Sequence, residues 1–145
     1  MASICVVIPL HNKGPHIARA LDSVMRQTAS AAEIIVVDDV SADEGPQIAG
    51  RYPGVQVLNR SKPGPGGYAA RNLGIRSARS DHIAFLDADD EWAENHLETM
   101  GAMIRAAPRD TVLFGTGYDE VHPGGHRIVD VYRRSGGAQR SLAFP

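Results

Sequence analysis

Apolar residues in the first hundred positions of this chain follow two alternating patterns. Short apolar runs, typical of strands in a parallel sheet, occupy residues 4–8, 34–37, 55–58 and 82–86, and the first is continuously apolar and mostly β-branched, as in a strand buried on both faces. Between the first two runs, apolar residues return at helical spacing, at Ile17, Leu21, Val24 and Met25. The alternation of strand and helix predicts an α/β fold with an open, mostly parallel sheet and helices on both faces.

Proline and glycine indicate where these elements begin and end. Pro9 is expected to end the first strand, and Pro15 suits the first turn of a helix that runs to about Gln27. The glycine-rich stretch 62–67 predicts a flexible turn where backbone can approach a ligand. Further helices are expected over 46–52, 68–78 and about 97–107, and two later strands over 111–118 and 127–132, joined by a turn at 123–125.

Composition narrows the class of protein. A chain of 145 residues with 43% hydrophobic residues and a net charge of -2 suits one soluble domain without the basic stripe of a nucleic-acid-binding protein. Cys5, the only cysteine, lies in an apolar run and is interpreted as a small buried hydrophobe. No signal peptide and no run long enough to span a bilayer is recognised, so a cytoplasmic protein is expected.

Polar residues lie at the carboxyl ends of three of the predicted strands. They are His11-Asn12, Asp38-Asp39 and the acidic run from Asp87 to Asp90. Because ligands bind beyond the carboxyl ends of the strands in open α/β sheets, the three groups are expected to converge on one site. An acidic turn that caps the following segment is the alternative for Asp38-Asp39.

The acidic run places several carboxylates at the end of a buried strand, where they repel one another. A bound divalent cation would offset this repulsion most simply, and Asp87 and Asp89 could both turn toward one oxygen-rich metal site. The alternative is a solvated acidic turn that caps the next helix. Asp90 is the candidate for that cap.

The helix after the glycine-rich stretch has features of an anion site. Gly66 and Gly67 precede its first turn, whose backbone N–H groups favour a diphosphate, and Arg71 could add a charge-assisted hydrogen bond. A surface arginine on an amphipathic helix is the alternative for Arg71. Lys13 and Lys62 are weaker candidates for phosphate contacts.

Five segments in order resemble family 2 glycosyltransferases of the GT-A fold. They are residues 7–13 (VIPLHNK), 23–28 (SVMRQT), 33–41 (EIIVVDDVS), 69–75 (AARNLGI) and 85–92 (FLDADDEW), the last similar to the DxD region of the family. The resemblance covers residues 4 to about 105. It implies that residues 1–145 form one nucleotide-sugar-binding domain, the N-terminal part of a longer enzyme, in which residues 109–145 begin the acceptor-side region.

The resemblance also implies roles for individual residues. The loop of Pro9, Leu10, His11 and Asn12 would hold the nucleoside, with the His11 ring under the base. Asp39 would accept a hydrogen bond from the base, which suits an acceptor-only carboxylate. Asp89 would bind Mg²⁺ or Mn²⁺, while Asp87, with Ala88 beside it, would contact the ribose or the metal.

The reaction implied by the resemblance is transfer of a sugar from a nucleoside-diphosphate donor to an acceptor hydroxyl, with inversion at the anomeric carbon. Inversion requires a carboxylate base, and Asp119, Glu120 and Asp130 match no motif, so no base is assigned and this chain by itself could bind the donor without transferring it. The acceptor, the nucleotide and the oligomeric state stay open.

Other functions share parts of this pattern. A sugar-phosphate nucleotidyltransferase would use the same sheet edge and metal, and a non-catalytic nucleotide-binding module would need no base. Residues 64–69 fit the dinucleotide pattern G-x-G-x-x-A, but they do not follow a strand directly. A haloacid-dehalogenase-like phosphatase is excluded because its acidic pair lies on the first strand and the position of Glu91 would be Thr or Val.

Overall fold

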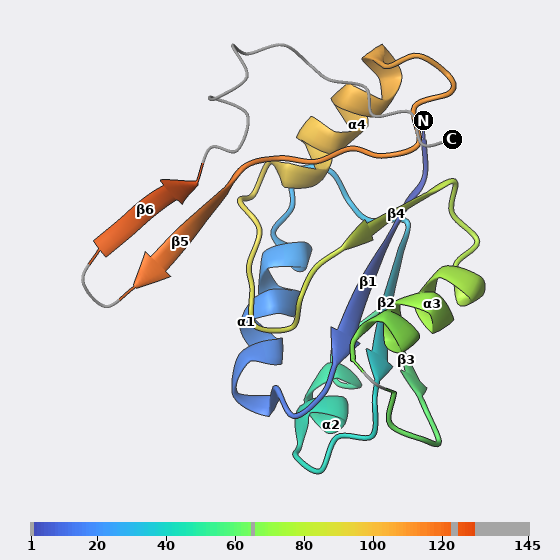
Figure 1. Ribbon diagram of the computed structural model, residues 1–145, viewed down its shortest axis with the longest axis vertical. Coiled ribbons are helices and arrows are strands. Elements are labelled where there is room, and N and C mark those ends of the chain that lie inside the picture. The colour runs from blue at the N-terminus through green and yellow to red at the C-terminus, as the bar shows by residue number, and fades with distance from the viewer. Residues whose placement is uncertain (1, 65, 123–124, 130–145) are drawn as a thin grey trace. The chain divides into compact units, whose positions relative to one another are not determined.

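The computed structural model describes residues 2–64, 66–122 and 125–129, and the chain divides into two compact units, Met1–Ala102 and Met103–Pro145. Strands and helices alternate through the first unit, as predicted (Figure 1). In chain order they are β1 (Ile4–Leu10), α1 (Gly14–Met25), β2 (Glu33–Asp38), α2 (Gly45–Ala49), β3 (Val55–Asn59), α3 (Tyr68–Ser77) and β4 (His82–Phe85). The division between the units falls within α4 (His96–Ala106).

The four strands of the first unit form one sheet in the order β3-β2-β1-β4, and all of their pairings are parallel. The chain steps from β1 to β2 to β3 in one direction and then crosses back to β4 on the other side of β1. Because such crossovers are right-handed, α1 and α2 lie on one face of the sheet and α3 on the other (Figure 1). The predicted parallel sheet with helices on both faces is confirmed.

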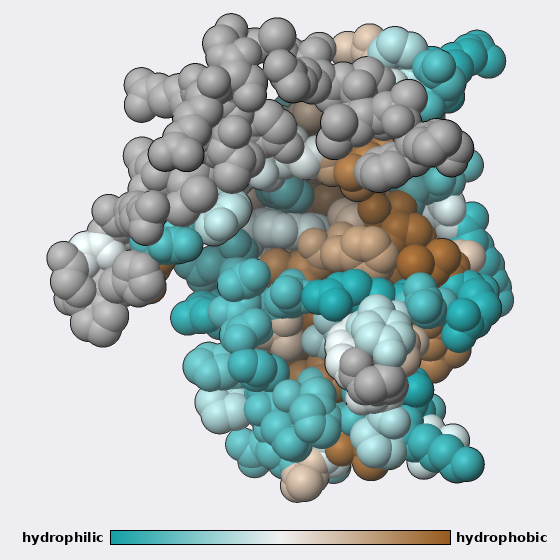
Figure 2. Space-filling view, viewed as in Figure 1, coloured by the Kyte–Doolittle hydropathy of each residue, from teal (hydrophilic) through white to brown (hydrophobic). Residues whose placement is uncertain are grey.

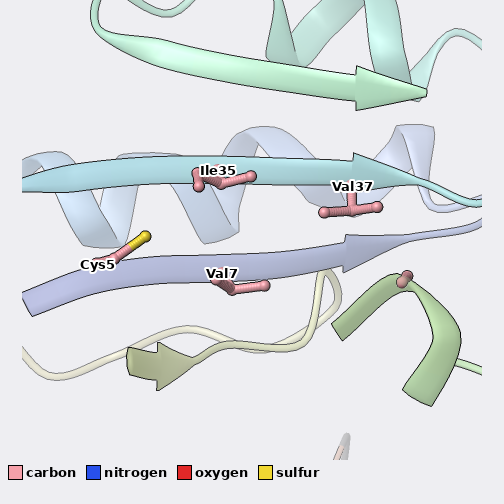
Figure 3. Close-up of a cluster of buried hydrophobic side chains, with 5 residues drawn as sticks. Cys5, Val7, Ile35 and Val37 are labelled. Atoms are coloured by element: carbon pink, nitrogen blue, oxygen red, sulfur yellow. The ribbon is translucent and has the colours of Figure 1, made fainter. Parts of the chain in front are cut away.

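Strand β1 lies between two neighbours and is the most buried element. Its side chains alternate between the two faces of the sheet, and Cys5 and Val7 share one face with Ile35 and Val37 of β2 (Figure 3). These four residues pack against Ala70 of α3 to form a buried cluster. A strand buried on both faces requires the continuous apolar run seen in its sequence.

Pro9 does not end β1, which continues to Leu10. The carbonyl of Leu10 accepts a hydrogen bond from Asp39 after β2 (2.8 Å), whereas the carbonyl of Val7 accepts one from Leu86 after β4 (3.2 Å). The backbone groups of successive residues in a strand point to opposite sides. Because the Leu10 carbonyl points toward β2, the backbone nitrogen of Pro9 points toward β4, whose pairing with β1 has already ended at Phe85. A proline without an N–H is tolerated there because no neighbouring strand needs that donor.

Helix α1 buries the predicted positions Ile17, Leu21 and Val24, but Met25 is 40% exposed, so its predicted place in the apolar stripe is wrong. The surface over α1 and the loop after β4 is mostly hydrophilic (Figure 2), in keeping with the exposed Arg19 of α1 and Glu91 of that loop.

The second unit contains an antiparallel pair, β5 (Tyr118–His122) and β6 (Gly125–Val129). The strand predicted over 111–118 is wrong, since residues 111–117 form no regular element. Val112 and Leu113 are apolar but 75% and 62% exposed, and an apolar run becomes a strand only where a partner strand pairs with it. Residues 123–124 of the predicted turn and 130–132 of the last predicted strand lie outside the described residues.

Gly74 of α3 lies directly against β1. A Cβ atom added at Gly74 would approach Cγ1 of Val7 to 2.4 Å, so Gly74→Ala should overpack this contact and lower the free energy of unfolding by about 1–3 kcal/mol in urea denaturation. Gly50→Ala is the matched control, because its Cβ would meet only ordinary contacts at 3.5 Å or more. Equal stability of the two variants would contradict the packing.

Burial of Cys5 raises its pKa from 9.0 to about 11. The folded protein therefore holds the thiol proton more tightly than the unfolded chain, and this stabilisation is complete below pH 9 and lost as the pH rises toward 11. The difference in stability between the protein and Cys5→Ala should shrink over that range in urea titrations. Ellman's reagent at pH 8 should react only after unfolding, and rapid reaction with the folded protein would contradict this burial.

Candidate functional site

A cavity of about 330 Å³ opens at the edge of the sheet where β1, β2 and β4 end. Its wall combines the loops after these strands with the turn before α3 and the first residues of that helix. The lining residues are Pro9, Leu10, His11, Lys13, Asp39, Pro63, Gly64, Gly66, Gly67, Ala70, Asp87, Ala88 and Asp89. This size and position suit a small-molecule site of an open α/β sheet.

The carboxylate of Asp39 is 8% exposed and already has two donors. Arg60 forms an ion pair with its Oδ1, and the Gly64 N–H donates to Oδ1 (3.1 Å) and, at greater length, to Oδ2 (3.3 Å). A Cβ at Gly64 would lie 2.7 Å from the Cβ of Ala69 and 2.6 Å from the Arg60 guanidinium, so a larger residue would disturb this close packing. Oδ2 therefore keeps more capacity than Oδ1 to accept a hydrogen bond from a ligand.

His11 and Asn12 tie the loop after β1 to the loop after β2. His11 donates from Nδ1 to the Asp39 carbonyl (2.8 Å), and the Asn12 side-chain carbonyl accepts from the N–H of Ala42 (2.8 Å). The backbone N–H of Asn12 donates to Ser41 Oγ (3.0 Å). His11 lines the cavity while Asn12 does not, so Asn12 shapes the loop rather than the wall.

Two carboxylates of the acidic run pair with basic side chains from other elements. Lys13, at the start of α1, donates from Nζ to Asp89 Oδ2 (2.7 Å), and Arg71 of α3 forms an ion pair with Asp87. The hydrogen bond from Lys13 holds the pKa of Asp89 below its ordinary value, and the same bond raises the pKa of Lys13. The repulsion anticipated from the sequence is thus offset by side-chain cations.

Asp90 differs from its neighbours. Burial, and then the charges of Asp89 and Asp87, raise its pKa above the ordinary value. Helix α4 begins only at His96, so Asp90 does not cap it as predicted.

The segment that follows the acidic run is held against the end of α1. The buried Gln27 amide donates to the carbonyls of Ser23 (3.1 Å) and Ala93 (2.7 Å), and its oxygen accepts from the N–H of Leu97 (2.8 Å). Ser23 Oγ accepts from the N–H of Trp92 (3.1 Å), whose ring stacks on His96. These bonds fix the loop whose first residues, Asp87 to Asp89, form part of the cavity wall.

The donor set at the cavity suits a hard divalent cation that is shared with a ligand. Among the described residues, no three His, Cys, Asp or Glu side chains are grouped so that they could hold a metal by themselves. Mg²⁺, however, is usually bound by only one or two carboxylates together with substrate phosphates and water. Asp89 and Asp87 on the wall provide that number of carboxylates once their basic partners move away.

Most of the residues predicted for the site come together on this wall. They are Pro9, Leu10, His11, Asp39, Gly66, Gly67, Asp87, Ala88 and Asp89. Asn12, Arg71 and Lys62 do not line the cavity, although Asn12 and Arg71 contact residues that do.

Pro63 and Gly64 lie in the predicted ligand-approaching turn, whereas Arg60 and Ala70 were not predicted for the site and Lys13 was predicted only as a weaker candidate. Arg60 could have been found, because it directly follows β3 and so lies at the same edge of the sheet as the other strand ends.

Comparisons with known proteins agree with the fold. The sequence model described as Glycosyl transferase family 2 matches residues 5–140. The glycosyltransferase GlyG of Streptococcus pneumoniae serotype 4 is 33% identical over 76% of this chain and 38% of its own length. The succinoglycan biosynthesis protein ExoW of Rhizobium meliloti is 43% identical over 67% of this chain and 32% of its own. The chain therefore spans about a third of the length of these relatives.

Solved structures of similar fold contain nucleotides. TarS of S. aureus in complex with UDP has a TM-score of 0.65 and 28% identity over 71% of this chain and 32% of its own. The mannosyltransferase PcManGT of Pyrobaculum calidifontis, in complex with GDP-Man and Mn²⁺, has a TM-score of 0.67 and 26% identity over 74% of this chain and 33% of its own. Within the described part of the present chain, no helix has the length and hydrophobicity needed to cross a membrane.

The Arg60–Asp39 pair predicts a stability effect. Arg60→Met would leave a nearly buried carboxylate without its cation and should lower the free energy of unfolding by about 2 kcal/mol in urea denaturation. Arg51→Met, at an exposed position after α2, is the matched control and should change stability little. If both variants unfold at the same urea concentration, the pair does not stabilise the fold.

Proposed function

Because this chain belongs to glycosyltransferase family 2 and has the GT-A fold, we propose that its cavity binds a nucleoside-diphosphate sugar whose sugar is transferred to an acceptor hydroxyl. The observation that carries the proposal is the composition of the cavity wall. One wall brings together the nearly buried carboxylate of Asp39, the two carboxylates of Asp87 and Asp89, and the residues just before the start of a helix. TarS bound to UDP and UDP-GlcNAc, and PcManGT bound to GDP-Man, support this class of ligand.

The nucleoside is assigned to the side of the cavity formed by β1 and β2. Asp39 accepts a ring N–H of the base through Oδ2, while Arg60 and Gly64 hold the carboxylate in place. Pro9 and Leu10 provide apolar wall beside it, and the His11 ring, held by its bond to the Asp39 carbonyl, lies under the base. This arrangement orients the donor before any chemistry occurs.

The diphosphate is assigned to the start of α3. The first N–H groups of a helix have no partner within the helix and favour an anion, and α3 starts just after Gly66 and Gly67, with Arg71 one turn further on. Gly66 adopts a φ of +113°, which glycine alone accepts readily. Asp87 contacts the ribose or a cation shared with Asp89.

Asp89 is proposed as the main protein ligand of Mg²⁺ or Mn²⁺. Such an ion, when bound, would act as a Lewis acid that neutralises charge on the departing nucleoside diphosphate. The Mn²⁺ in the PcManGT complex supports this choice.

Inversion at the anomeric carbon is proposed for the transfer, and it requires a carboxylate base on the acceptor side. The cavity carboxylates Asp39, Asp87 and Asp89 already serve the donor in this scheme, so the base is a carboxylate outside the cavity wall. We propose that residues 1–145 act as the nucleotide-sugar-binding portion of the enzyme, and that residues 109–145 belong to the acceptor side. The hydroxyl acceptor is left open.

Calorimetric titration with UDP, GDP and dTDP, each with and without Mn²⁺, tests donor binding. One nucleotide should bind in a metal-dependent manner, and Asp89→Asn should weaken that binding by about tenfold or more, because a metal ligand is lost. Glu91→Gln is the matched control, since its side chain is 57% exposed and off the cavity wall.

Nucleotide affinity that is changed neither by Mn²⁺ nor by the Asp89→Asn substitution would contradict the assignment of Asp89 as a metal ligand. Formation of a sugar nucleotide from a sugar phosphate and a nucleoside triphosphate would instead indicate a nucleotidyltransferase.

A further inference from the structure

Lys13 is a basic residue of the cavity wall that contacts Asp89. Its side chain lines the cavity and is 42% exposed, and its ammonium donates to Asp89 Oδ2 at 2.7 Å. Asp89 is the carboxylate assigned above to the metal. Lys13 and a divalent cation therefore compete for the same carboxylate oxygen.

The Lys13–Asp89 ion pair can be broken at a small cost in free energy. Both side chains are more than 40% exposed, and exposed ion pairs of this kind contribute little free energy. Lysine also carries its charge on a flexible four-carbon stem, so the ammonium can turn within the cavity without movement of the backbone. By contrast, the Arg60–Asp39 pair is buried and holds a side chain in place.

The charges on the cavity wall balance before a ligand binds. Asp39, Asp87 and Asp89 each pair with a basic side chain, from Arg60, Arg71 and Lys13 respectively. A nucleoside diphosphate sugar with one divalent cation is also close to neutral as a pair. Binding of the cation and the diphosphate together preserves the charge balance of the cavity. Binding of the cation alone would leave Lys13 without a counter-charge, and binding of the diphosphate alone would leave Asp89 without one.

We propose that Lys13 couples metal binding to diphosphate binding by exchanging partners. In the protein without ligands, Lys13 occupies the position beside Asp89. When a divalent cation takes that carboxylate, the Lys13 ammonium turns to the phosphates of the donor and adds a charge-assisted hydrogen bond. This inference rests on the proposed function and assigns Lys13 a role that its ion pair alone does not reveal.

The exchange makes the two binding events cooperative. The metal releases Lys13 for the diphosphate, and by linkage the diphosphate must favour the metal by the same factor. Lys13 thus weakens binding of the metal alone and strengthens binding of the nucleotide in the presence of metal. These opposite signs separate an exchange from a purely structural role.

Lys13→Met tests the exchange, and its fold should be kept. The start of α1 depends on Pro15 and on the backbone carbonyl of Lys13, which accepts hydrogen bonds from the N–H groups of His16 and Ile17, both at 2.9 Å. The Lys13 side chain takes no part in these interactions. Lys62→Met is the matched control, because Lys62 is exposed, lies off the cavity wall, and forms no ion pair with any residue that the structure describes. Unfolding in urea verifies that both variants are folded.

Two affinities are measured for each variant. The first is that of Mn²⁺ alone, from the electron paramagnetic resonance signal of unbound Mn²⁺. The second, by calorimetry in saturating Mn²⁺, is that of whichever of UDP, GDP and dTDP binds the unmodified protein. Lys13→Met should bind Mn²⁺ alone about two- to fivefold more tightly and the nucleotide about three- to tenfold more weakly. Lys62→Met should match the unmodified protein in both measurements.

The outcomes separate this inference from the proposed function. If the unmodified protein binds no nucleoside diphosphate with Mn²⁺, the proposed function fails and the exchange fails with it. If it binds one, but Lys13→Met weakens both affinities together or changes neither, the exchange alone is wrong.

Discussion

Neutralisation of carboxylates at the end of a parallel sheet is the constraint on which the rest of this structure depends. Asp39, Asp87 and Asp89 meet at one edge because β2 and β4 flank β1 in parallel. The nearly buried Asp39 needs a counter-charge because the interior cannot solvate it, whereas the more exposed Asp87 and Asp89 gain from counter-charges because they repel each other. The chain supplies Arg60, Arg71 and Lys13 from three separate segments, and the carboxylate of each pair lines the cavity.

The pairs differ in burial, and this difference separates their roles. Asp39 and Arg60 are 8% and 20% exposed and fix the position of an acceptor, whereas Lys13 and Asp89 are both more than 40% exposed. Interactions that orient a ligand benefit from rigid partners, while those that are replaced by a ligand must be easy to break. The cavity wall therefore combines a carboxylate that is held in place, Asp39, with one whose basic partner is easily displaced, Asp89.

The rigidity of the wall comes from the packing behind it. Strand β1 is buried on both faces, and α3 approaches it closely because Gly74 has no side chain to displace Val7. Ser23 and Gln27, at the end of α1, hold the segment after Asp89 through three hydrogen bonds. In these contacts Ser23, Gln27 and Gly74 support the site from behind and are not part of the cavity wall.

The sequence alone determined the order of strands and helices in the first unit and the presence of carboxylates after two of the strands, because both follow from local patterns of apolar and polar residues. The extents of β1 and of the strand expected at 111–118 were predicted incorrectly, since pairing with a neighbouring strand decides where a strand continues. Only the tertiary structure decided which cation faces which carboxylate. Lys13 and Asp89 lie 76 positions apart, and Arg60 and Asp39 lie 21 apart, so no local pattern relates them. The side chains that meet at the cavity do so because the crossovers and the parallel pairing bring distant strand ends to one edge.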